Sequence, residues 1–194
     1  LENRPALSVS GQVDRSGSVG LLFQDPRTQL VRERVRSDVA FGLENRGVAP
    51  ERIHDQIDTW ADRLNVTHLL DRAVDALSRG ERTLVALLGL LVTEPDVIVL
   101  DEPLAALDAT NRSLVLDTVD ELRGETALLV AEQNVSPLLT RVDRVLVLED
   151  GGIGAAGSPR EVLPALQRSR VRLPFGTQVA LERGTPVEEV PLTG

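Results

Sequence analysis

Residues 76–108 read ALSRGERTLVALLGLLVTEPDVIVLDEPLAALD, which we interpret as a short polar turn, an apolar helix, a break at Glu94-Pro95 and a β-rich run that ends in two carboxylates. Within it, residues 97–100 form a continuous apolar run between Pro95 and the acidic pair Asp101 and Glu102. Such a run is typical of a strand buried on both faces of a parallel sheet. The acidic pair therefore follows the carboxyl end of the strand, where open α/β sheets bind their ligands. Because adjacent carboxylates in an apolar layer need cations or donors, we expect one to hold a divalent metal ion and the other to act as a base.

The length of 194 residues fits one domain, or one domain with a small appendage. The chain contains no cysteine, which excludes a disulfide framework and thiol chemistry and suits a reducing compartment. Its net charge of −9 argues against a nucleic-acid-binding surface. The longest apolar run, residues 84–92, is too short to cross a bilayer. The composition therefore indicates a globular domain with no nucleic acid among its partners.

Three short motifs in the opening stretch resemble those of a known family. LSRGE (77–81), VIVLDEP (97–103) and ALD (106–108) resemble the signature motif, the Walker B motif and the D-loop of the nucleotide-binding domain of ABC ATPases. An ordinary buried strand with a solvated acidic end is the alternative, and the order and separation of all three motifs disfavour it. The resemblance implies an α/β fold with a mainly parallel sheet flanked by helices and an α-helical signature subdomain.

The same resemblance predicts how the chain is divided. We expect a partial ABC ATPase domain at residues 1–170, with the helical subdomain at 31–90, and a small C-terminal extension at 171–194. A linker to a second ATPase half would give a similar pattern in this last segment. The chain contains no Lys, so the P-loop pattern G-x-x-x-x-G-K-[ST] does not occur in it. It contains no Met either, so we expect that Leu1 is not a translation start. We therefore expect a piece of a longer chain, with the N-terminal P-loop portion missing.

Two further segments narrow the subfamily. DPRTQL (25–30) and DVAFGLENRGV (38–48) resemble the ATPases of energy-coupling-factor importers, which take up vitamins and transition-metal ions such as cobalt. SGQV (10–13) is similar to the S-G-x-V segment that the family carries after its first helix. The resemblance implies a peripheral ATPase on the cytoplasmic face of the cell membrane that couples ATP hydrolysis to transport. Its implied partners are a second ABC ATPase subunit or half, a transmembrane coupling subunit and a substrate-binding membrane subunit.

The implied ligands are ATP and Mg²⁺, and the resemblance assigns residues to each. Asp101 would bind Mg²⁺ through its water shell, and Gln24, which follows the apolar run 19–23, would complete the metal environment. Glu102 would orient or deprotonate the attacking water. Ser78 and Gly80 would contact the γ-phosphate of ATP bound to the opposite subunit, and Asp108 would link the two ATP sites across the dimer interface.

Three positions depart from the family pattern. Arg79 replaces the usual first glycine of the signature, and Glu81 replaces the usual glutamine and adds negative charge near an anion site. Gln133 stands where many importers have a switch histidine; it can hydrogen-bond a γ-phosphate or water but cannot carry a proton as histidine does. These departures support a second hypothesis, a docking and dimerisation module that hydrolyses little ATP. The DNA-repair ABC ATPases are disfavoured because residues 24–77 leave no room for a coiled-coil insertion.

Other segments give secondary-structure expectations. A helix should begin at Pro50, with an apolar face formed by Ile53, Ile57, Trp60 and Leu64. Further along, we expect a helix at 113–122, strands at 127–131 and 145–148, and a hairpin turn at 149–152. Residues 157–162 resemble a helix start of the family, and the chain after residue 171 reads as short segments separated by Pro and Gly.

Overall fold

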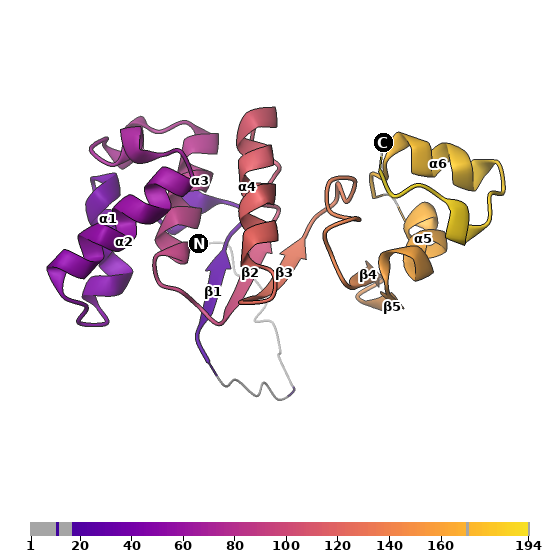
Figure 1. The fold of residues 1–194 in the computed structure, drawn as a ribbon, viewed down its shortest axis with the longest axis horizontal. Helices are drawn as coiled ribbons and strands as arrows, with labels where there is room; N and C mark the ends of the chain where they lie inside the picture. Colours follow the sequence, from indigo (N-terminus) through magenta and orange to yellow (C-terminus); the bar gives the residue numbers. More distant parts are fainter. Residues whose placement is uncertain (1–10, 12–16, 170, 194) are drawn as a thin grey trace, which may run out of the picture.

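The structure, a computed structural model, describes residue 11 and residues 17–169 and 171–193. Three strands form a parallel sheet in the order β1 (Val19–Leu22), β2 (Val97–Asp101) and β3 (Ala127–Ala131) (Figure 1). The register places Leu22 beside Leu100 and Leu100 beside Val130. The mainly parallel sheet expected from the apolar runs is confirmed. Apart from Gly11, the SGQV segment lies outside the described residues.

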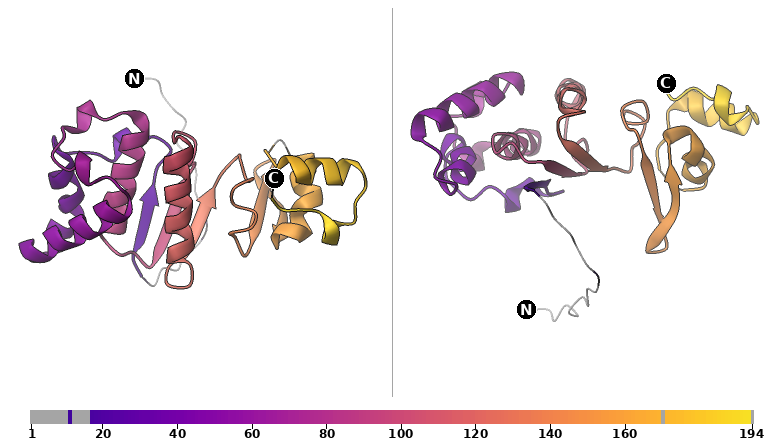
Figure 2. Two further views of the ribbon diagram at one scale, coloured as in Figure 1. Left: turned by 45° about the horizontal axis from the view of Figure 1, so that its top comes forward. Right: turned by 60° about the horizontal axis from the view of Figure 1, so that its bottom comes forward.

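The two faces of this sheet differ because successive side chains of a strand point to opposite sides. Leu22, Ile98 and Leu100 are buried in the main core beneath helices α3 (Arg79–Leu91) and α4 (Ala109–Leu122). These helices lie on one side of the sheet (Figure 2). Leu21 and Leu129 are exposed. The residues that follow the three strands meet at the carboxyl edge of the sheet, which is where the candidate site forms.

Helix α4 begins at Ala109, four residues before the predicted start at Ser113. The reason is a cap: the Asp108 carboxylate accepts a hydrogen bond from the backbone N–H of Asn111 at 2.9 Å. A side-chain oxygen at this position satisfies one of the free N–H groups of the first turn. The D-loop aspartate therefore has a structural role within its own chain.

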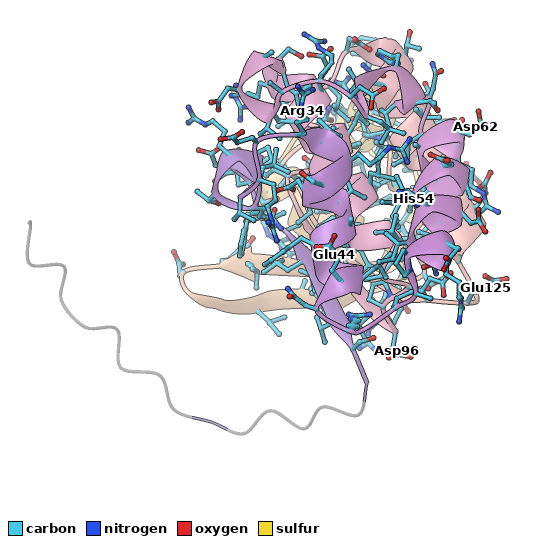
Figure 3. All side chains as sticks on the ribbon, turned by 90° about the vertical axis from the view of Figure 1, so that its left-hand side faces the viewer. Arg34, Glu44, His54, Asp62, Asp96 and Glu125 are labelled. Atoms are coloured by element: carbon cyan, nitrogen blue, oxygen red, sulfur yellow. The ribbon has the colours of Figure 1, made fainter. Side chains whose placement is uncertain are left out.

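Helices α1 (Val35–Glu44) and α2 (Pro50–Arg63) pack beside α3. A 3₁₀ turn at Pro26–Thr28 lies between β1 and α1, and two more, at Thr67–Leu69 and Val74–Ala76, lie between α2 and α3. As predicted, α2 begins at Pro50 and buries Ile53 and Ile57. Trp60 is half-buried against the core, and Arg63 stacks over its ring at 4.8 Å from the centroid. Figure 3 shows polar side chains such as His54 and Asp62 on the outer surface of these helices.

The C-terminal part is built on a hairpin of β4 (Val145–Glu149) and β5 (Gly152–Gly157). Its turn contains Asp150 at φ 49° and Gly151 at φ 80°, the left-handed pair that two-residue hairpin turns require. Helices α5 (Pro159–Arg168) and α6 (Phe175–Glu182) and a 3₁₀ turn at Val187–Glu189 follow. The sequence did not predict α6, whose apolar and polar residues lack a clear helical period.

Two hydrophobic cores meet at one short segment. Leu138 is buried in the main core, whereas Leu139 is buried in a second core between the hairpin and α5. The hairpin and α5, which enclose the second core, lie beyond β3 in Figure 1. No helix of the described residues is long and apolar enough to span a membrane.

Candidate active site

The candidate site is centred on Glu102, which directly follows β2. Its backbone N–H donates to the Ala131 carbonyl at 2.9 Å, so β3 holds the main chain at this point. Its φ of 47° lies in the left-handed region, which is uncommon for a residue with a side chain and is found at functional turns. This turn directs the chain out of the sheet immediately after the second carboxylate.

Two amide side chains hold the Glu102 carboxylate. Gln24 Nε2 donates to one carboxylate oxygen at 2.9 Å, and Gln133 Nε2 donates to the other at 2.7 Å. Gln24 follows β1 and Gln133 follows β3, so the ends of all three strands contribute. A carboxylate has about four lone-pair positions, and two donors leave it free to accept a further proton donor such as water. The arrangement fixes the orientation of Glu102 and preserves its capacity as a base.

Asp101 is the last residue of β2 and is half-buried. Along β2 it alternates with the buried Ile98 and Leu100, so it belongs to the sheet face opposite α3 and α4. No group of three or more His, Cys, Asp or Glu among the described residues could enclose a metal ion. Mg²⁺ does not need such a group, because it is usually bound by one or two carboxylates together with phosphates and water. The Asp101 carboxylate and the Gln24 side-chain carbonyl are donors that fit that ion.

Glu132 is a site residue that sequence reasoning missed. It lies between β3 and Gln133, it is half-buried, and its carboxylate accepts a hydrogen bond from the Leu104 backbone N–H at 3.0 Å. Burial raises the pKa of Glu132, and the nearby charge of Glu102 adds to the effect, although the Leu104 hydrogen bond opposes it. Its signal in the sequence was an acidic residue directly after an apolar strand, the same pattern that identified Asp101.

The signature segment forms the first turn of α3. Ser78 is the N-cap: its Oγ accepts from the Glu81 backbone N–H at 3.2 Å, and its own N–H donates to the Glu81 carboxylate at 2.6 Å. This reciprocal pair is a capping box. Ser78 Oγ therefore acts as the acceptor for the first turn of α3 within this capping box. Gly80 is tightly packed, because a Cβ there would lie 3.2 Å from the Ala106 carbonyl oxygen.

Glu81 changes the electrostatic expectation for this segment. Arg72 pairs with its carboxylate at 2.8 Å, and the pKa of Glu81 is lowered by the Ser78 N–H, with smaller contributions from the Ser78 hydroxyl and Arg72. The expected uncompensated negative charge is therefore offset within the chain. Arg79 is close enough to affect the loop after β1: the pKa of Asp25 is lowered by hydrogen bonds from Arg27 and, to a smaller extent, by the charge of Arg79.

The predicted site residues thus form two groups. Gln24, Glu102 and Gln133 are joined by hydrogen bonds at the carboxyl edge of the sheet, next to Asp101. Ser78, Arg79, Gly80 and Glu81 form the first turn of α3, and Asp108 caps α4. No hydrogen bond joins the two groups within the described part of the chain.

A parallel sheet that ends in adjacent carboxylates, together with a capped helix N-terminus, is typical of α/β nucleotide-binding domains. Residues 4–105, more than half of the chain, match the family described as ABC transporter, and the chain belongs to this family. The family resemblance and the fold class predicted from the sequence are confirmed. Proteins of this family bind ATP, typically with Mg²⁺.

Two curated relatives of this chain are named as energy-coupling factor transporter ATP-binding proteins. The chain is 35% identical over 182 residues to the energy-coupling factor transporter ATP-binding protein EcfA1 of Bacillus subtilis, covering 90% of this chain and 65% of that protein. It is 34% identical over 171 residues to EcfA1 of Clostridium novyi, covering 85% of this chain and 60% of the relative. The chain therefore spans less than two thirds of the length of these curated relatives.

A solved structure supports the same assignment. The structure of cbiO1 from Clostridium perfringens, described as part of the ABC transporter complex cbiONQ, matches with a TM-score of 0.66 and 30% identity. The match covers 89% of this chain and 68% of that one. The fold of this chain is therefore similar to that of a protein described as part of an ABC transporter complex.

Proposed function

We propose that this chain is the ATP-binding and ATP-hydrolysing part of an energy-coupling-factor importer for a vitamin or a transition-metal ion. It would act at the cytoplasmic face of the membrane, with a second ABC ATPase subunit or half, a transmembrane coupling subunit and a substrate-binding membrane subunit. The relatives named as energy-coupling factor ATP-binding proteins and the cbiO1 structure support this proposal. The observation that carries the catalytic part is the Glu102 carboxylate held between Gln24 and Gln133.

The reaction would be transfer of the terminal phosphoryl group of ATP to water. A general base must lie within hydrogen-bond reach of the proton that it takes, in a fixed direction. The two amides provide that direction for Glu102, which orients or deprotonates the attacking water. Asp101 and Gln24 would hold Mg²⁺, which neutralises the charge that develops on the phosphates.

Gln133 has a role that suits a carboxamide. Its NH₂ group is engaged with Glu102, and its side-chain carbonyl remains able to accept a hydrogen bond from water. It carries no charge, so it cannot stabilise developing negative charge as a protonated histidine does. We therefore assign Gln133 to orientation of Glu102 and water rather than to proton transfer.

The signature turn would serve the second composite site of a dimer. A helix N-terminus offers free N–H groups and a positive dipole end, which favour phosphate. Gly80 leaves the backbone close to the neighbouring loop, and Arg79 adds positive charge. In this arrangement Ser78 and Gly80 contact ATP bound by the opposite subunit, and Asp108 lies toward the interface.

A catalytically degenerate docking and dimerisation module is the second candidate. Arg79 in the signature and Gln133 in place of histidine favour it. The hydrogen bonds around Glu102 argue against it, because a module without hydrolysis has no need for an oriented carboxylate at this position. The two candidates differ in whether Glu102 determines turnover.

The decisive experiment is ATP turnover of the full-length protein with its partner ATPase, with Glu102→Gln compared with wild type. Loss of a general base lowers the rate by about 10²–10⁴-fold, and nucleotide binding should remain. Glu121→Gln, which removes an exposed carboxylate from α4, is the matched control and should leave turnover unchanged. Equal turnover of wild type and Glu102→Gln would refute the catalytic assignment and support the docking module.

A further inference from the structure

The main chain around Gln133 is held by the C-terminal part of the chain. Strand β3 ends at Ala131, so the sheet does not fix this segment. The Gln133 carbonyl accepts a hydrogen bond from the Arg172 backbone N–H at 2.9 Å, and Asn134 and Arg172 form an isolated parallel bridge. Ser136 Oγ donates to the Arg172 carbonyl at 3.3 Å. Both main-chain polar groups of Arg172 therefore bind the segment that carries Gln133.

Arg172 is in turn fixed by the second core. Its neighbour Leu173 is buried there, and Val171 packs against the same core. Gln178 Nε2, on α6, donates to the Leu173 carbonyl at 2.9 Å. The position of the Arg172 peptide groups is therefore set by the C-terminal part and not by the parallel sheet.

The other end of the segment also reaches both cores. The backbone N–H groups of Leu138 and Leu139 both donate to the Val135 carbonyl, at 2.9 and 3.1 Å. Leu138 packs in the main core, and Leu139 and Val135 pack in the second core. A displacement between the two parts must therefore be taken up by the segment that includes Gln133.

We propose that Arg172 is a positioning residue, whose main chain sets the place of Gln133 and, through the 2.7 Å bond from Gln133 Nε2, the orientation of Glu102. A shift of the C-terminal part relative to the sheet, such as a partner docking on it would cause, changes the Glu102 site through this connection. The proposal deepens the proposed function and rests on it, since it assigns regulation to the same site.

The test uses the main chain, because the Arg172 contacts are main-chain contacts. Arg172→Pro removes the N–H donor to Gln133 and keeps the carbonyl. Arg172→Ala is the matched control, since it removes the guanidinium and keeps both peptide groups. Ser136→Ala removes the second contact without altering the backbone.

The primary readout is solvent exchange of the Gln133 side-chain NH₂ group, measured by NMR in the 194-residue chain. We expect Arg172→Pro to increase its exchange rate about fivefold, the equivalent of one net hydrogen bond of ~1 kcal/mol. Arg172→Ala should match wild type, and Ser136→Ala should lie between them. In the full-length ATPase, Arg172→Pro should lower kcat and leave the KM for Mg-ATP unchanged.

Several results would overturn the proposal. These are an unchanged exchange rate in a folded Arg172→Pro variant, or an equal increase in Arg172→Ala. If Arg172→Pro fails to fold by circular dichroism, Ser136→Ala decides, and an unchanged exchange rate there overturns the proposal. If exchange changes as expected but wild type hydrolyses no ATP, the positioning role stands and the proposed function fails.

Discussion

The capping box at the signature turn yields a quantitative prediction. In the structure the Glu81 carboxylate accepts from the Ser78 N–H at 2.6 Å and pairs with Arg72 at 2.8 Å, with its side chain 27% exposed. Loss of one cap contact costs about 1 kcal/mol, and a partly exposed ion pair adds at most about 1 kcal/mol. Glu81→Ala should therefore lower the free energy of unfolding by about 1–2 kcal/mol.

Glu81→Gln is the matched variant, because glutamine also completes a capping box. It keeps the acceptor for the Ser78 N–H and loses only the charge, so it should cost less than about 1 kcal/mol. Urea denaturation followed by circular dichroism measures both values. In a domain of this size, 1 kcal/mol corresponds to about 2–4 °C in Tm.

The pH dependence of the same variant provides a second check. The folded-state pKa of Glu81 is lowered, so its contribution is complete above the unfolded pKa and is lost as pH falls through the folded pKa. The difference between wild type and Glu81→Ala should therefore shrink in acid. A difference below about 0.5 kcal/mol at neutral pH, the range of ordinary surface substitutions, or one that grows as pH falls, would refute the capping argument.

Two further predictions concern the half-buried Glu132 and the second hydrophobic core. Glu132→Gln should raise the free energy of unfolding at neutral pH. The pKa of Glu132 is raised in the folded state, so the ionised carboxylate increasingly opposes folding as pH rises through the folded-state pKa. The gain in stability over wild type should therefore disappear on acidification, and a gain that persists in acid would contradict this prediction. Leu139 is 1% exposed in the second core, so Leu139→Ala should lower the free energy of unfolding, measured by urea denaturation, by about 2–5 kcal/mol. Leu148→Ala, at a position 76% exposed on β4, is the control and should lower it by less than about 0.5 kcal/mol. Equal losses would contradict the assignment of the second core.

The local features of the fold could be predicted from the sequence. The apolar run before Asp101 identified the central strand, Pro50 marked the start of α2, and Asp150 with Gly151 marked the hairpin turn. Each depends on residues close together in the chain, because periodicity, proline and left-handed turns act locally. The family motifs supplied the identity of the candidate site residues.

The features that sequence reasoning missed depend on distant contacts or on side-chain caps. The early start of α4 follows from the Asp108 cap, and the importance of Glu132 follows from its hydrogen bond to Leu104. Gln24 and Glu102 are 78 residues apart and bond only because neighbouring parallel strands end at one edge. The contact of Arg172 with Gln133 joins two separate cores, and no local pattern in either segment indicates it.

We propose that the Glu102 edge is the catalytic end of an ATP site that needs a P-loop of the pattern G-x-x-x-x-G-K-[ST], which does not occur in this sequence. Calorimetric titration with Mg-ATP tests it directly, on this chain and on the chain joined to the P-loop segment of a relative. Without the lysine of the P-loop pattern, Asp101 and Glu102 would face the phosphates with little compensation. We predict saturable binding only for the joined protein. Saturable micromolar binding by the 194-residue chain alone, or no binding by either protein, would contradict this proposal.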